Sequence, residues 1–128
     1  MKKTTQYAVM ASIVAALALT TTAHASRNQD VERQVRSYFK DIPVMVRIAK
    51  CESGFRHYDP RHPSGLLTNP SPRSSATGVL QILLKTHGPN ARRLGFDLKT
   101  VKGQLGYAKH LYKQNGTRDW NASRSCWS

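Results

Sequence analysis

Two cysteines set the tightest constraint on how this chain of 128 residues can fold. They follow a leader typical of a secretory signal peptide, with a basic start, an apolar run over residues 8–19 and a small-x-small sequence at residues 23–25. An exported chain reaches an oxidising compartment, where Cys51 and Cys126 are expected to pair. The bond would tie the C-terminus to the middle of the chain and stabilise the fold by roughly 4 kcal/mol through chain entropy.

The predicted mature chain, residues 26–128, is long enough for one compact domain and is strongly basic. Loss of Lys2 and Lys3 with the leader leaves 18 basic residues against 7 acidic ones, a net charge of +11. This excess favours an anionic partner, such as an acidic cell-wall polymer or a membrane face. Export argues against nucleic acid, and no second long apolar run predicts stable membrane insertion. Two isolated cysteines without histidines at metal-ligand spacing make a poor metal site.

One carboxylate, Glu52, continues the apolar stripe of a predicted helix. Met45, Ile48, Ala49 and Glu52 stand at positions i, i+3, i+4 and i+7, which places them on one helix face. A carboxyl group at an apolar position has its charged form disfavoured, so its pKa should rise, as a general acid requires. The alternative interpretation is a helix-end residue that points to water.

Apolar periodicity predicts three longer helices in the mature chain. The first spans residues 30–40, the second runs from Pro43 to about Cys51, with Glu52 at its end, and the third spans residues 101–115 behind Thr100 as its N-cap. The stripes of the first and third helices consist of Val31, Val35, Tyr38 and Phe39, and of Val101, Leu105, Ala108, Leu111 and Tyr112.

The chain between the second and third helices is less regular. Residues 54–77 contain four prolines and predict a long loop, in which these prolines disfavour a hairpin. The apolar run at residues 78–86 predicts a buried helix, with Gln81 as the one polar residue of its apolar core. A buried amide must find partners, and the backbone is the simplest one. A short helix is predicted over residues 89–94, ended by Gly95.

Two kinds of side chain near the C-terminus allow two interpretations each. Trp120 and Trp127 could cover the core, or they could form a platform on which a sugar stacks. His110 could be a surface histidine or a ligand-binding one.

Four short motifs, in this order, resemble those of the soluble lytic transglycosylases, cell-wall enzymes of the lysozyme superfamily. Residues 52–55 match the Glu-Ser-x-Phe signature, and residues 75–82 resemble the Gly-Ala-x-Gly-Leu-Met-Gln-Ile block. Residues 107–111 fall where the family has a helix ending in Ala-x-Tyr-Leu. Residues 120–122 fall where many members have Tyr-Asn-Ala-Gly. The resemblance covers about residues 44–127.

The resemblance implies a mainly α, lysozyme-like (goose-type) single domain over residues 26–128, with a long irregular loop, one disulfide and a groove for a glycan strand. It implies Glu52 as the single catalytic acid/base and no cofactor. Glu52 would protonate the oxygen between N-acetylmuramic acid and N-acetylglucosamine, then deprotonate the muramyl C6 hydroxyl, which closes a 1,6-anhydro ring. The residues that the resemblance places at the substrate are Ser53, which would help to position Glu52, and Ser75, Gln81, His110, Tyr112, Trp120 and Asn121.

Three positions depart from the family pattern. Several members have a tyrosine whose hydroxyl bonds to the catalytic glutamate, whereas Trp120 stands in that region and has only an N–H donor. Tyr107 or Tyr112 could supply the hydroxyl, or the contact could be absent. His110 stands where tyrosine is usual, and Ser123 replaces the glycine that follows Asn-Ala.

The expected partner is peptidoglycan, in the periplasm or outside the cell, with a secretion or conjugation machine of the envelope as a further option. Three other functions compete with lytic transglycosylation. One is a hydrolytic lysozyme, the second is a non-catalytic peptidoglycan-binding assembly protein, and the third is a cationic membrane-active protein. Two-carboxylate glycosidases need a second acid at a set separation, and no second acid lies in a matched motif.

Overall fold

A computed structural model describes residues 26–128, so the predicted signal peptide lies outside the described part. This part is mainly helical and has one disulfide, as expected. It also contains a two-stranded sheet, which the sequence did not predict. After a helix at residues 26–38, its elements are α2 (Pro43–Ser53), β1 (Ala76–Thr77), β2 (Ile82–Leu83), α3 (Leu84–Arg93), α4 (Val101–Asn115), the 3-10 helix η1 (Arg118–Ser123) and α5 (Arg124–Trp127). Within residues 26–128, no helix is both long and apolar enough to cross a membrane.

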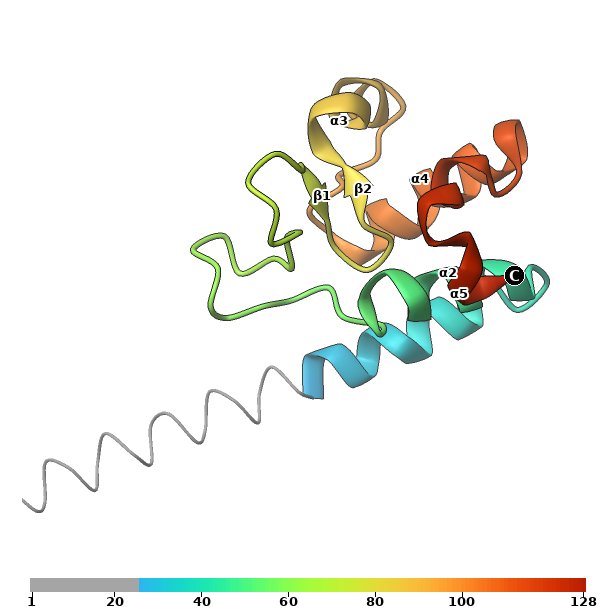
Figure 1. Ribbon diagram of the computed structural model, residues 1–128, viewed down its shortest axis with the longest axis horizontal. Helices are drawn as coiled ribbons and strands as arrows, with labels where there is room; N and C mark the ends of the chain where they lie inside the picture. The colour runs from blue at the N-terminus through green and yellow to red at the C-terminus, as the bar shows by residue number, and fades with distance from the viewer. Residues whose placement is uncertain (1–25) are drawn as a thin grey trace, which may run out of the picture.

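The N-terminal helix and α2 form the base of the molecule in the view of Figure 1. Val31, Val35 and Phe39 are buried as predicted, whereas Tyr38, predicted in the same stripe, is exposed. In α2, proline occupies the first turn, where its missing N–H costs nothing. Gly54, in the left-handed region at φ +63°, ends the helix immediately after Ser53.

The helix predicted over residues 78–86 is wrong, because this segment forms a hairpin and then the start of α3. β1 and β2 pair antiparallel, with Ala76 opposite Leu83, and residues 78–81 form the turn between them. Gly78 and Gln81 both have positive φ, at +72° and +49°. The apolar residues of the turn are buried by neighbouring elements on several sides, so burial here carries no helical period.

Helix α3 begins earlier than predicted and contains Pro89 in its interior. Proline normally excludes helical backbone at the preceding residue, because its ring meets that residue's Cβ. Gly88 has no Cβ, so α3 continues through the Gly-Pro pair. The predicted end is confirmed, since Leu94 caps the helix and Gly95 adopts φ +85°.

The third predicted helix is confirmed in both bounds as α4. The Thr100 side chain accepts a hydrogen bond from the backbone N–H of Gly103 at 3.0 Å, and Gly116 follows the last turn. Of the predicted stripe, Tyr112 is half-buried and the other four residues are buried.

The long loop before β1 follows an irregular but bonded course, seen as the green segment at one side of Figure 1. Two isolated antiparallel bridges, Tyr58 with Leu66 and Thr68 with Thr77, replace a regular hairpin. Asn28 of the N-terminal helix connects to the start of the loop, because its side-chain oxygen accepts from the N–H of Tyr58 at 3.2 Å. The loop therefore belongs to the same packed unit as the helices.

Candidate active site

Glu52 lies at the penultimate position of α2, where the apolar stripe reaches the surface. Met45, Ile48 and Ala49 are fully buried, whereas Glu52 is half-buried. Burial raises the pKa of the Glu52 carboxyl above its usual value, and a hydrogen bond from Ser123 offsets part of this rise. A carboxyl group in this setting keeps its proton to higher pH, which suits a general acid.

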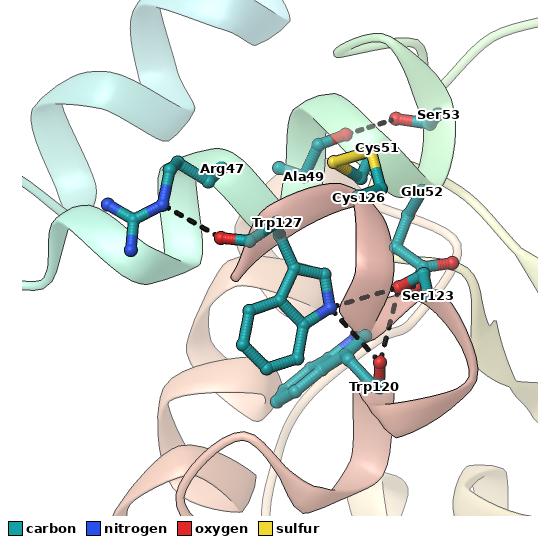
Figure 2. The surroundings of a disulfide bond; sticks show 9 residues. All are labelled: Arg47, Ala49, Cys51, Glu52, Ser53, Trp120, Ser123, Cys126 and Trp127. Carbon is teal, nitrogen blue, oxygen red and sulfur yellow. Dashed lines mark hydrogen bonds between the residues drawn. A yellow bond between two sulfur atoms is a disulfide. The ribbon is translucent and has the colours of Figure 1, made fainter.

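The predicted disulfide joins Cys51, next to Glu52, to Cys126 in α5, with 6.0 Å between the two Cα atoms. Arg47 gives a second connection, because its Nε donates to the backbone oxygen of Trp127 at 2.9 Å. Figure 2 shows both connections side by side, with the C-terminal segment packed on α2. They place η1 and α5 beside the carboxyl group of Glu52.

The hydroxyl of Ser123 contacts Glu52 directly and donates a hydrogen bond to its Oε1 (Figure 2). The same Oγ accepts a hydrogen bond from Nε1 of Trp127 at 3.1 Å and lies 3.2 Å from the backbone oxygen of Trp120. Ser123 therefore fills the place for which Tyr107 and Tyr112 were considered. The hydroxyl of Tyr107 is instead bonded to Asn90 and His87 of α3.

The turn at residues 78–81 lies between the end of α2 and η1, because side chains from both hold its carbonyl oxygens. Ser53 donates its hydroxyl to the oxygen of Val79 at 2.8 Å. Trp120 donates its indole N–H to the oxygen of Leu80 at 3.0 Å. The turn is thereby fixed relative to Glu52.

His57 holds the same turn from the long loop and is fully buried. Its Nδ1 accepts from the N–H of Val79 at 3.3 Å, and its Nε2 lies 2.9 Å from the oxygen of Lys99. This pair of contacts requires the neutral ring with its proton on Nε2. Burial lowers the pKa of His57, against the hydrogen bond to Lys99.

Gln104 of α4 is fully buried, and its role was not predicted from the sequence. Its oxygen accepts from the N–H of Leu80 at 3.1 Å. Its nitrogen donates to the oxygens of Thr77 at 2.7 Å and Leu98 at 3.1 Å. Gln104 thus connects the hairpin to the first turn of α4 and to Leu98, which precedes this helix.

Gln81 and Ser75, both predicted at the substrate, belong to the hairpin and the residues before it. Gln81 is half-buried, and its amide nitrogen donates to the oxygen of Gly78 at 3.0 Å, which matches the backbone interpretation. Ser75 is half-buried, and its hydroxyl accepts from the N–H of Lys85 at the start of α3. Both side chains are thus fixed by backbone contacts.

Ser53 and Trp120 are the two predicted substrate residues whose side chains are buried. Both are buried, at 5% and 4% exposure, so Ser53 supports the site from within and Trp120 covers the core. The burial of Trp120 favours the interpretation in which it covers the core over the one in which a sugar stacks on its ring. Trp127 is buried as well, at 5% exposure.

Three predicted substrate residues lie on α4 and η1. Asn121 is exposed, next to Trp120. His110 is half-buried and stacks on Tyr107, with ring centroids 5.6 Å apart, and Tyr112 packs against the core. Asn121 therefore lies in η1, the segment whose Ser123 contacts Glu52, whereas His110 contacts the ring of Tyr107.

Three acids outside the matched motifs, Asp59, Asp97 and Asp119, form contacts with other residues than Glu52. Asp59 forms an ion pair with Arg61, whose hydrogen bonds lower the pKa of Asp59 to about 2. Asp97 accepts from the N–H of Lys99 at 2.9 Å. Asp119 accepts from the side chain of Asn115 at 3.0 Å. Across residues 26–128, no group of three or more histidine, cysteine or acidic residues could hold a metal ion.

Sequence reasoning missed the roles of Ser123, His57 and Gln104. Ser123 carried a usable signal, because a hydroxyl replaces the glycine that the resemblance leads one to expect. His57 and Gln104 carried none, because their partners are backbone groups 22 and 24 residues away in the chain. Comparisons of the chain with protein-family models, curated proteins and solved structures found no match.

Proposed function

We propose that the protein is an exported lytic transglycosylase of lysozyme-like fold that cleaves peptidoglycan. The observation that carries the proposal is the setting of Glu52: a half-buried carboxyl with a raised pKa, fixed by Ser123 at the end of a rigid helix. The order of the four family-like motifs supports it. The segments that contain three of them meet around Glu52, through Ser53 and Trp120.

One carboxyl group can perform both proton transfers of this reaction. Protonated Glu52 gives its proton to the oxygen between N-acetylmuramic acid and N-acetylglucosamine as the C1–O bond breaks. The resulting carboxylate then takes the proton of the muramyl C6 hydroxyl, whose oxygen bonds to C1. Glu52 is protonated again, and the product ends in a 1,6-anhydro ring without uptake of water.

The charge of the described residues suits this substrate. Residues 26–128 have 18 basic and 7 acidic side chains, and three of the acids are paired with arginines. The remaining excess of positive charge attracts a polymer whose stem peptides carry carboxylates. Such attraction concentrates the enzyme on the wall without selecting a particular bond.

The test is digestion of purified peptidoglycan sacculi followed by mass analysis of the released muropeptides. A transglycosylase gives ends that are lighter than reducing ends by one water, whereas a hydrolytic lysozyme gives reducing ends. Glu52→Gln keeps the size of the side chain but has no proton to give, so it should release no muropeptides while it still binds sacculi.

Glu32→Gln is the matched control, because it removes the same charge from an exposed ion pair on the N-terminal helix. It should digest sacculi at the rate of the parent. Digestion by Glu52→Gln at that rate would show that Glu52 is not the catalytic residue. Binding of sacculi by the parent protein without any released muropeptide would support a non-catalytic assembly protein instead.

A further inference from the structure

The contacts of Ser123 also determine the direction in which its hydroxyl proton points. A serine hydroxyl has one proton to donate and two lone pairs that accept. Its Oγ lies beside Oε1 of Glu52, 3.1 Å from Nε1 of Trp127 and 3.2 Å from the oxygen of Trp120. Three neighbours therefore compete for one hydroxyl group, and the chemistry of each neighbour decides the outcome.

Trp127 limits the directions in which the hydroxyl of Ser123 can point. An indole N–H only donates, so it occupies a lone pair of Oγ and directs the hydroxyl proton away from the ring. The two acceptors that remain are Oε1 of Glu52 and the backbone oxygen of Trp120. Of these, a carboxylate is the stronger acceptor because it carries charge.

Trp127 is itself held firmly. Its side chain is buried at 5% exposure, its indole N–H is also 3.1 Å from the oxygen of Trp120, and its own backbone oxygen accepts from Arg47. The neighbouring Cys126 is joined to Cys51. The donor that orients Ser123 is therefore fixed before a substrate binds, which is the condition for a preorganised site.

We propose that Ser123 is the positioning residue of Glu52: oriented by the Trp127 indole, its hydroxyl occupies Oε1 and leaves Oε2 to carry the proton that reaches the glycosidic oxygen. This inference rests on the proposed function. It assigns the two carboxyl oxygens different roles. Oε1 accepts from Ser123 in both charge states, while Oε2 gains and loses the proton.

The hydroxyl also tunes the charge state of Glu52 between the two steps. When Oε2 has given up its proton, the Ser123 hydroxyl stabilises the carboxylate through Oε1. When Oε2 is protonated, Oε1 is a weaker acceptor, and the hydroxyl can share its proton with the oxygen of Trp120 at 3.2 Å. Loss of this hydroxyl should therefore disfavour the carboxylate.

The test compares Ser123→Ala with Ser123→Thr, which keeps a hydroxyl group. Initial rates of muropeptide release are measured against sacculus concentration and pH. Ser123→Ala should lower kcat on the order of 10- to 100-fold, as misplacement of a catalytic group does. KM should stay unchanged, and the alkaline limb of the pH profile should move to higher pH. Ser123→Thr should restore most of kcat and return the limb toward its parental position.

A second measurement does not depend on activity. The carboxyl carbon of Glu52, followed by NMR against pH, should titrate at higher pH in Ser123→Ala than in the parent and in Ser123→Thr. Parental kcat and an unmoved titration in Ser123→Ala, with Glu52→Gln inactive, would overturn this inference and leave the proposed function standing. Activity of Glu52→Gln would overturn the proposed function itself.

Discussion

Glu52 and Asp59 show at the residue level how placement decides what a carboxyl group can do. Asp59 is held by Arg61, which lowers its pKa to about 2 and keeps it charged at any physiological pH. Glu52 has Ser123 as its hydrogen-bond donor, and burial is the larger influence on its pKa. Only the second carboxyl is suited to exchange a proton with a substrate.

His57 gives the residue-scale prediction, because its contacts require the neutral ring. Protonation would place an N–H on Nδ1 against the N–H of Val79. Its pKa is lowered in the folded protein and is near 6.5 in the unfolded chain, so acid favours unfolding. We expect the free energy of unfolding to be highest above pH 6.5 and to fall as the pH drops toward the folded pKa.

Chemical denaturation between pH 7.5 and 4.5 measures this dependence. His57→Gln should reduce the slope below pH 6.5, because the titrating group is gone. The matched control is His62→Gln, which changes an exposed histidine and should keep the parental slope. Equal slopes in the parent and in His57→Gln would contradict the prediction.

At the scale of elements, the sequence could predict α2 and α4 because their signals are local. Pro43 and Thr100 stand at the two helix starts, Gly54 and Gly116 follow the ends, and an apolar stripe runs between them. These residues act within a few positions of the backbone groups that they satisfy. A sequence pattern can report interactions of that range.

The turn at residues 78–81 could not be predicted in the same way. Its backbone is satisfied by Ser53, His57, Gln104 and Trp120, which come from four other parts of the chain. An apolar run that is buried from several sides has the composition of a core helix. Only the tertiary contacts distinguish the two, so the composition of this run could not predict its secondary structure.

Gln104→Leu tests how strongly this turn depends on one side chain. The change keeps the approximate volume but leaves the N–H of Leu80 and the oxygens of Thr77 and Leu98 without the amide. Buried polar groups without partners cost about 1–3 kcal/mol each, so we expect a loss of about 2–5 kcal/mol in the free energy of unfolding.

Urea denaturation of Gln104→Leu and of the parent gives this loss. Gln114→Leu makes the same substitution at an exposed position of the same helix, and it should change the free energy by less than about 0.5 kcal/mol. A similar small change in both variants would mean that the three backbone groups find other partners.

At the scale of the whole molecule, the C-terminal segment packs on α2 and brings Ser123 to the carboxyl group of Glu52. Two cysteines allow one intramolecular pairing, and the predicted signal peptide favours an oxidising compartment, so the sequence was sufficient to predict the disulfide. It could not show that closing this bond would place Ser123 on Glu52. That contact depends on how η1 and α5 bend between residue 118 and Cys126.

Removal of the disulfide should therefore affect stability and activity by different routes. Replacing Cys51 and Cys126 by alanine frees a loop with a sequence separation of 75 residues. The unfolded chain gains entropy, so the free energy of unfolding should fall by up to about 4 kcal/mol. In the molecules that stay folded, the segment with Ser123 keeps the Arg47 contact but loses its covalent anchor. The Glu52 carboxyl should then titrate at higher pH, and muropeptide release should slow.

Both effects are measured at a temperature at which circular dichroism shows the parent and the double variant fully folded. Thr100→Ala serves as the control, because loss of this N-cap destabilises the fold by about 1 kcal/mol and leaves the C-terminal segment anchored. It should keep the parental rate and the parental titration of Glu52. If the double variant, while folded, also keeps both, then packing alone positions Ser123. If it loses no stability, the unfolded chain gains no freedom from the open loop.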